Sequence, residues 1–209
     1  MAFTGIPHGA AEFYMALEED NSKEFWAAHR QGYEREVRDP LVALLADLED
    51  EFGSAKIFRP HRDVRFSSDK SPYKTHQGAY VPVATATGWY IEISADGIRV
   101  GGGTYQLDAA ALRAYRAGVD GPTGAVLDRI VTDLEQAGWE VGGDQVATAP
   151  RGWSRDHERI RLLRRKTLAA SRILNDADII ATPRLADHVR REWRDLAPLV
   201  QWLRDIVPA

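Results

Sequence analysis

The chain has 209 residues, no cysteine, 44% hydrophobic residues and a formal net charge of −4. The absence of cysteine excludes disulfides, thiol catalysis and cysteine-ligated metal centres. No apolar run approaches the roughly 18 residues of a membrane-spanning helix, and the N-terminus lacks a basic stretch followed by an apolar one. We therefore expect a cytoplasmic protein with no membrane partner.

The first quarter of the sequence predicts three helices within residues 7–53. Ser22 is placed to cap the second helix, because a serine oxygen accepts a free backbone N–H at a helix start. Asp39 and Pro40 are typical of a cap followed by a first helical residue, so they predict a fresh start for the third helix. Gly53 ends it, since glycine tolerates the backbone turn beyond a helix.

The region 56–105 is predicted to be mainly β. Asp96 and Gly97 indicate a tight hairpin turn between two strands, because Asp-Gly supports positive φ. The sequence Gly101-Gly102-Gly103 at the end of the last strand indicates a bulge or a close backbone approach rather than a nucleotide loop, since position 106 is not glycine. The predicted strands cover residues 56–60, 62–66, 79–85, 89–94 and 98–105.

The second half is predicted to be mixed over residues 108–181, followed by a long helix over 183–206. Asp108 is the expected cap of the first helix in this half. Further strands are predicted at 139–143 and 145–149, with a short basic helix from Asp156. Blocks of helices and strands of this kind favour one α+β domain over residues 1–209, with a largely antiparallel or mixed sheet.

Positive charge is concentrated in two segments of an otherwise acidic chain. The first basic island, residues 56–76, has six Lys or Arg against two Asp. The second basic island, residues 151–172, has eight Lys or Arg against one Asp and one Glu. Such a distribution would attract anions to particular places on the molecule.

The first basic island has the composition of an anion site. If residues 59–66 are extended, one face carries alternating side chains, namely Arg59, His61, Asp63 and Arg65. Guanidinium groups bind phosphate or carboxylate through paired hydrogen bonds. Asp63 would orient the arginines, and Tyr73 would position or stack on a ligand. These two are the candidate catalytic residues, although the sequence does not assign a reaction. Any chemistry would stabilise a developing negative charge.

The same island resembles the signature of a bacterial family of this length, domain of unknown function 2461. The pattern R-x-x-R-D-x-R-F-x-x-x-K-x-P-Y-K is matched without a gap from Arg59 to Lys74. The resemblance extends to Asn21–Trp26, to Gly101–Tyr105 and to Pro150–His157. Serine at 22, the order Phe25-Trp26 and glutamate at 158 depart from the family pattern. The resemblance implies no activity.

The leading hypothesis is a cationic cleft for a small phosphorylated or carboxylated ligand, with no metal and no cofactor. Its predicted ligand-binding residues are Arg59, Arg62, Arg65, Lys70, Lys74, Tyr105 and Arg151. The histidines show no metal-ligand spacing, and the arginines around them would repel a cation. Two alternatives stand beside this hypothesis. One is a nucleic-acid-binding module, which the sequence pI of about 5.9 disfavours. The other is a structural Arg/Asp network with the function elsewhere.

Overall fold

The computed structural model describes residues 2–65 and 69–207, which fall into two compact units. Unit 1 consists of Met1–Val81, Tyr90–Val100 and Ile173–Arg191, and unit 2 of Pro82–Trp89, Gly101–Arg172 and Glu192–Ala209. Each unit is built from three separate segments of the chain, so the two units do not correspond to an N-terminal and a C-terminal half. The single domain expected over residues 1–209 stays a prediction.

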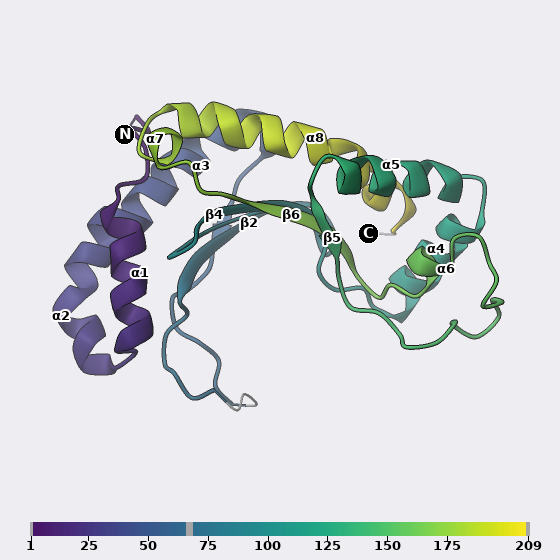
Figure 1. Ribbon diagram of the computed structural model, residues 1–209, viewed down its shortest axis with the longest axis horizontal. Helices are drawn as coiled ribbons and strands as arrows, with labels where there is room; N and C mark the ends of the chain where they lie inside the picture. Colours follow the sequence, from purple (N-terminus) through teal and green to yellow (C-terminus); the bar gives the residue numbers. More distant parts are fainter. Residues whose placement is uncertain (1, 66–68, 208–209) are drawn as a thin grey trace. The chain divides into compact units, whose positions relative to one another are not determined.

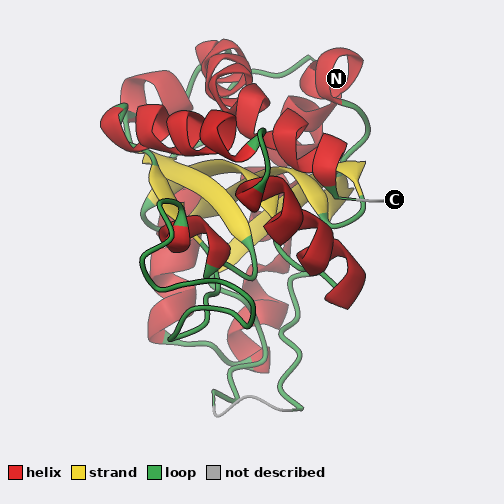
Figure 2. Cartoon of the chain, turned by 90° about the vertical axis from the view of Figure 1, so that its right-hand side faces the viewer, coloured by secondary structure: helices red, strands yellow, loops and turns green. Residues whose placement is uncertain are grey.

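The described strands form one six-stranded sheet, in the order β1-β2-β3-β4-β6-β5. The strands are β1 (Lys56–Ile57), β2 (His76–Ala84), β3 (Thr87–Ser94), β4 (Gly97–Thr104), β5 (Glu140–Gly142) and β6 (Leu168–Leu174). The pairs β1–β2 and β5–β6 are antiparallel, and hairpins join β2 to β3 and β3 to β4. Figure 2 shows these strands in yellow. The predicted α+β class with a largely antiparallel sheet is confirmed.

Unit 1 begins with helices α1 (Gly9–Glu19) and α2 (Lys23–Tyr33), which lie side by side (Figure 1). Ser22 caps α2 as predicted, because its oxygen accepts the N–H of Phe25 at 3.0 Å. The helical chain continues through η1 (Glu34–Arg38) into α3 (Asp39–Phe52), which ends at Gly53 with φ of 95°. Apolar side chains from all these helices are buried, among them Leu17, Val37 and Leu41.

The third helix, α3, begins at Asp39 with Pro40 in its first turn, as predicted, but Asp39 does not cap it, because the helical chain runs on from η1. Asp39 has helical φ and ψ, and its N–H donates to the carbonyl of Glu34, five residues earlier. Proline has no N–H, and its ring clashes with the carbonyl four residues before it in a regular α-helix. A single wide π-helical turn ahead of Pro40 removes this clash and lets the helix continue. Such turns are frequent at functional sites.

Unit 2 contains α4 (Ala109–Asp120), α5 (Gly124–Gln136) and α6 (Ile160–Leu163). Asp108 caps α4 as predicted, accepting the N–H groups of Ala110 and Ala111. Tyr115 and Leu127 are among the largest side chains buried in this unit.

Two helices follow β6, namely α7 (Ala177–Ile180) and the predicted long C-terminal helix, α8 (Arg184–Ile206), which runs on past Pro198. None of the described helices is long and apolar enough to cross a membrane.

Two strand predictions are wrong, and one strand was not predicted. Residues 62–65 are not a strand, and Phe66 lies outside the described residues. Residues 145–149 form only an isolated bridge from Gln145 to Arg165. The strand that was not predicted is β6.

The triple glycine explains how β6 packs. A Cβ on Gly103, which has φ of 138°, would lie 2.4 Å from the carbonyl oxygen of Leu168. A Cβ on Gly101 would lie 2.8 Å from the carbonyl oxygen of Ala170. The close backbone approach expected from this sequence is therefore present.

Candidate functional site

The chain between β1 and β2 is an irregular extension of their hairpin, and it projects from the sheet (Figure 1). Lys74 N–H donates to the Pro60 carbonyl at 2.9 Å, and Arg62 N–H donates to the Pro72 carbonyl at 2.9 Å. Between them, His61 and Tyr73 form an isolated antiparallel bridge. The strict side-chain alternation expected over 59–66 is therefore wrong. Residues 74–78 outnumber residues 58–60 on the opposite side of the hairpin, so the backbone hydrogen-bond ladder between the two sides is interrupted.

A buried glutamine fills the gap in this ladder. The Gln77 amide nitrogen donates to the carbonyls of Phe58, at 2.7 Å, and Gly78, at 2.9 Å. Its amide oxygen accepts the hydroxyl of Tyr33 at 2.5 Å. Burial, and then the charge of Glu34, raise the pKa of Tyr33 to about 12, so this hydroxyl remains a donor. Gln77 thereby attaches the base of the projecting segment to α2.

Asn21 and Trp26 hold the same segment from the start of α2. The Asn21 side chain makes two 3.1 Å hydrogen bonds to the backbone of Tyr73, accepting its N–H and donating to its carbonyl. The Tyr73 ring stacks on Trp26, with ring centroids 4.3 Å apart and 9° between planes. Tyr73, a candidate catalytic residue, is therefore buried as a packing residue. Two separate parts of the resemblance, 21–26 and 59–74, thus lie against each other.

These attachments create a cleft of about 520 Å³ in unit 1. One wall comes from α2 and η1, through Trp26, Arg30, Tyr33, Glu34 and Arg38, and the other from residues 57–61. The π-helical turn contributes Glu34 and Arg38, which form an ion pair at 3.5 Å. Arg30 and Arg59 are exposed, and neither side chain has a hydrogen-bonded or ion-paired partner among the described residues.

Several cations predicted to bind a ligand are instead paired within the projecting segment. Arg65 makes hydrogen bonds of 2.7–3.2 Å to Asp63, which lower the pKa of that carboxyl. Arg62 pairs with Asp69, and the Lys70 amine donates to the Val64 carbonyl at 2.9 Å.

Hydrogen bonds from Ser71 lower the pKa of the Asp69 carboxyl.

Asp63 forms hydrogen bonds with one arginine, Arg65, and not with the several arginines that it was expected to orient.

Lys74 is the exception. Its side chain has no carboxylate partner among the described residues, and its nitrogen lies 5.3 Å from the centroid of the Phe58 ring. Burial, followed by the charges of Arg59 and Arg62, lowers the pKa of Lys74. Two other cations of the predicted set, Arg59 and Arg62, are therefore close enough to Lys74 to repel its charge.

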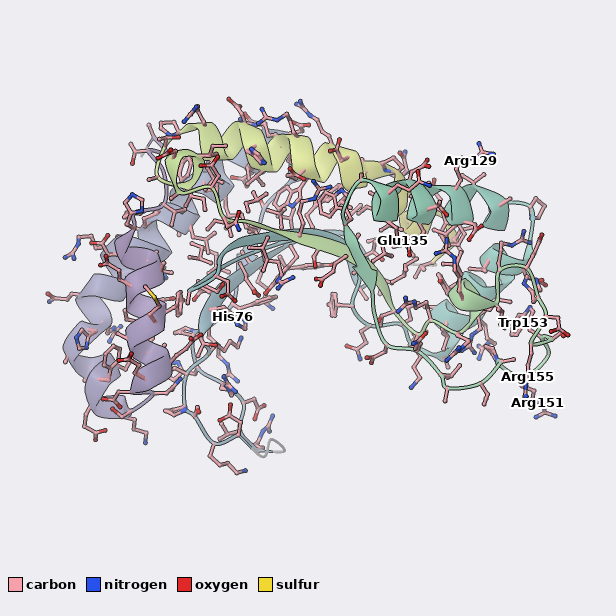
Figure 3. All side chains as sticks on the ribbon, viewed as in Figure 1. His76, Arg129, Glu135, Arg151, Trp153 and Arg155 are labelled. Carbon is pink, nitrogen blue, oxygen red and sulfur yellow. The ribbon has the colours of Figure 1, made fainter. Side chains whose placement is uncertain are left out.

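A second polar cluster lies on the neighbouring sheet surface. Glu92 accepts the hydroxyl of Tyr90 and lies 3.5 Å from Arg99 and 3.8 Å from His76. Figure 3 labels His76 at the start of β2. Burial lowers the pKa of His76, and Lys74, Arg62 and Arg99 lower it further, against the opposing effect of Glu92. The Phe58 ring is 6.5 Å from that of Tyr90, so Phe58 borders both this cluster and the cleft.

The second basic island belongs to unit 2 and is largely engaged in structure. Arg159 donates to the carbonyls of Val119, at 2.8 Å, and Asp120, at 3.1 Å, and so caps the end of α4. His157 pairs with the Asp120 carboxylate at 2.9 Å. Arg161 bridges two carboxylates of α5, those of Asp128 and Glu135. Arg164 and Arg165 donate to the carbonyls of Val146 and Gly143.

The remaining predicted ligand residues also belong to unit 2. Arg151 lies on the loop that carries Trp153 and Arg155 (Figure 3). Tyr105 is 63% exposed and lines a separate hollow of about 330 Å³ beside the start of α4. Neither belongs to the unit 1 cleft.

Sequence reasoning missed Arg30, Glu34, Arg38 and Gln77. The first three recur at intervals of four, which places them on one helical stripe, but a charged stripe is also the ordinary solvent face of a helix. Gln77 is 1% exposed, and nothing in its sequence position marks it as buried. No group of three or more His, Asp or Glu in the described part of the chain is arranged to hold a metal ion.

Comparison with the curated proteins gives no significant match, and comparison with the solved structures gives none. One family model does match, and it covers nearly the whole chain, including α2, the projecting segment and the sheet. Residues 9–202 fit the family described as conserved hypothetical protein DUF2461, and the chain therefore belongs to that family.

Proposed function

We propose that unit 1 binds a small phosphorylated or carboxylated ligand in the cleft between α2–η1 and residues 57–61. The observation that carries this proposal is that Arg59 lines the cleft without an ion-paired partner among the described residues, close to two further cations, Arg62 and Lys74, that do not line it themselves. Like charges held close together destabilise the empty protein, and a bound anion relieves that repulsion.

The chemistry of the cleft supports the same proposal. Arg30 and Arg59 come from opposite walls and have no described partner, so both guanidinium groups are available to a ligand. Arginine forms paired hydrogen bonds with carboxylate and phosphate, and such charge-assisted bonds are stronger than neutral ones. Arg59 is the motif residue assigned to binding, and Lys74 adds positive charge near it. Arg65 and Lys70 are assigned to holding the projecting segment.

Isothermal titration calorimetry of the full chain tests the proposal, with phosphate monoesters and small carboxylates as ligands. Arg59→Ala is expected to weaken binding about tenfold to a hundredfold, because a charge-assisted hydrogen bond contributes about 1.5–3 kcal/mol. Arg65→Ala is the matched control, since this exposed arginine of the same segment is paired with Asp63. Equal losses in the two variants, or no binding of any anion to the unmodified protein, would overturn the proposal.

A further inference from the structure

The cleft is larger than an inorganic anion needs. A phosphate group takes the space of only a few water molecules, each of which occupies about 30 Å³ in the liquid. The cleft volume of about 520 Å³ instead lies in the range of about 300–1,000 Å³ that is usual for organic ligands. Most of the space therefore remains to be filled by another part of the ligand.

Rings line much of the cleft. On one wall, Phe58 is half-buried and His61 is exposed. On the opposite wall, the buried Trp26 and Tyr33 line the cleft. Trp26 is fixed by its stacking on Tyr73, and Tyr33 by its hydrogen bond to Gln77. These surfaces are therefore positioned before a ligand arrives, so binding costs little side-chain entropy.

Arg30 and Phe58 come from opposite walls of the cleft. A guanidinium group is planar and stacks on aromatic rings as well as binding anions. Phenylalanine pairs with other rings in offset-stacked or edge-to-face arrangements. A flat ring between these walls would contact apolar surface on one side and a weakly hydrated cation on the other.

We infer that the ligand of this cleft is an organic anion that carries a flat aromatic ring, such as a nucleoside monophosphate or an aryl carboxylate. The inference rests on the proposed function, because it assigns the ring to the space that the anionic group leaves. Arg59 holds the anionic group, and Phe58, His61 and Arg30 hold the ring. Glu34 is the only carboxylate among the described lining residues. It accepts hydrogen bonds from the N–H groups of a nucleobase when the ligand carries one.

The test compares matched pairs of ligands on the full chain by calorimetry. Methyl phosphate and phenyl phosphate differ only in the ring, as do acetate and benzoate, and adenosine monophosphate extends the first series. Phenyl phosphate is expected to bind about tenfold to a hundredfold more tightly than methyl phosphate, from the apolar area that its ring buries. A preference confined to the phosphate pair or to the carboxylate pair identifies which anionic group the cleft takes.

Two variants locate the ring. Phe58→Leu keeps an apolar side chain but removes the aromatic face, and is expected to reduce the preference for phenyl over methyl phosphate at least threefold. Phe25→Leu is the control, because Phe25 stacks on His29 of α2 and does not line the cleft. His61→Ala provides a second, exposed position should Phe58→Leu lower the melting temperature.

The outcomes separate the two proposals. Equal affinity of the unmodified protein for methyl and phenyl phosphate, both dependent on Arg59, overturns the aromatic ligand and leaves anion binding in place. A ring preference that survives both Phe58→Leu and His61→Ala also overturns it. Binding that does not depend on Arg59 overturns the proposed function itself.

Discussion

The two basic islands are both rich in Lys and Arg, but their cationic side chains are paired differently in the folded protein. In the second island, Arg159 is matched to carbonyl groups at the end of α4 and Arg161 to carboxylates of α5. Arg151 and Arg155 instead lie on a loop, have no hydrogen-bonded or ion-paired partner among the described residues, and line neither the unit 1 cleft nor the hollow beside α4.

In the first island, Arg62 and Arg65 are matched to Asp69 and Asp63, whereas Arg59 and Lys74 form no ion pair within the described part of the chain. A dense run of positive charge therefore indicates a site only where an unpaired cation lines a cleft, as Arg59 does.

The difference has a physical origin. The carbonyl groups at a helix C-terminus carry partial negative charge and lack partners within the helix, so a guanidinium placed there satisfies them. The side chain of Arg159 is only 13% exposed, which makes it a structural cap. The cations of the first island extend from an irregular hairpin that a neutral side chain, Gln77, anchors. Arg59 is consequently placed on the wall of the cleft, where a ligand can reach it.

The largest expected effect concerns that neutral anchor. Gln77→Met should leave the carbonyl of Phe58 and the Tyr33 hydroxyl without this partner, whereas the Gly78 carbonyl still accepts the N–H of Phe58. We expect the free energy of unfolding to fall by about 3 kcal/mol, since each buried group left unpaired costs about 1–3 kcal/mol. Urea denaturation measures the loss, and Gln106→Met is the control. A loss below about 1 kcal/mol would show that the hairpin does not depend on this amide.

The next prediction contrasts one arginine from each island. Arg159→Ala should lower the free energy of unfolding by about 2 kcal/mol, because it leaves carbonyls at the end of α4 without a donor. Arg59→Ala should change it by no more than about 0.5 kcal/mol. Arg155→Ala is the control within the second island, as its side chain has no hydrogen-bonded partner among the described residues. If Arg59→Ala proves as destabilising as Arg159→Ala, the islands do not differ as described.

A third prediction follows from the lowered pKa of His76. Because the folded protein binds this proton less readily than the unfolded chain, protonation of His76 favours unfolding. Stability should therefore be full above the usual value of 6.5 and decline as the pH falls below it. His76→Gln should flatten this part of the profile of melting temperature against pH. An unchanged profile in the variant would assign the pH dependence to other groups.

A smaller effect is expected at Lys74. Lys74→Met replaces the cation–π contact with the Phe58 ring by an apolar one and removes a charge that Arg59 and Arg62 repel. We expect the empty protein to become more stable by about 0.5 kcal/mol, while its affinity for phosphate esters falls. Lys56→Met is the control, because Lys56 is an exposed lysine of the same island. A variant that is destabilised and binds normally would contradict the role assigned to Lys74.

The smallest effect is expected at Asp63. Its hydrogen bonds to Arg65 lower its pKa, so its contribution to stability is present above the usual 3.8 and is lost as the pH falls through the lower folded value. Because this pair is exposed to solvent, Asp63→Asn should leave the melting temperature at neutral pH within experimental error. A large loss of stability would mean that the first island, like the second, is a structural network.

The sequence alone determined the elements whose signals are local. Ser22 and Asp108 as caps, Gly53 as a helix end, the hairpin at Asp96-Gly97 and the long C-terminal helix all follow from side chains acting on backbone a few residues away. The family signature likewise indicated the first island as a candidate site. These predictions hold because backbone geometry and short-range hydrogen bonds do not depend on the rest of the fold.

Only the tertiary structure decided which cations are matched and which are left for a ligand. The strand β6 and the burial of Gln77 each depend on partners far away in the sequence. The pairing of Arg159 with the end of α4, 40 residues earlier, depends on them in the same way. Electrostatic energies vary with distance and solvent exposure, and neither quantity is encoded in the spacing of charges along the chain. For that reason the sequence does not show that Arg62 and Arg65 form ion pairs, whereas Arg59 and Lys74 form none among the described residues.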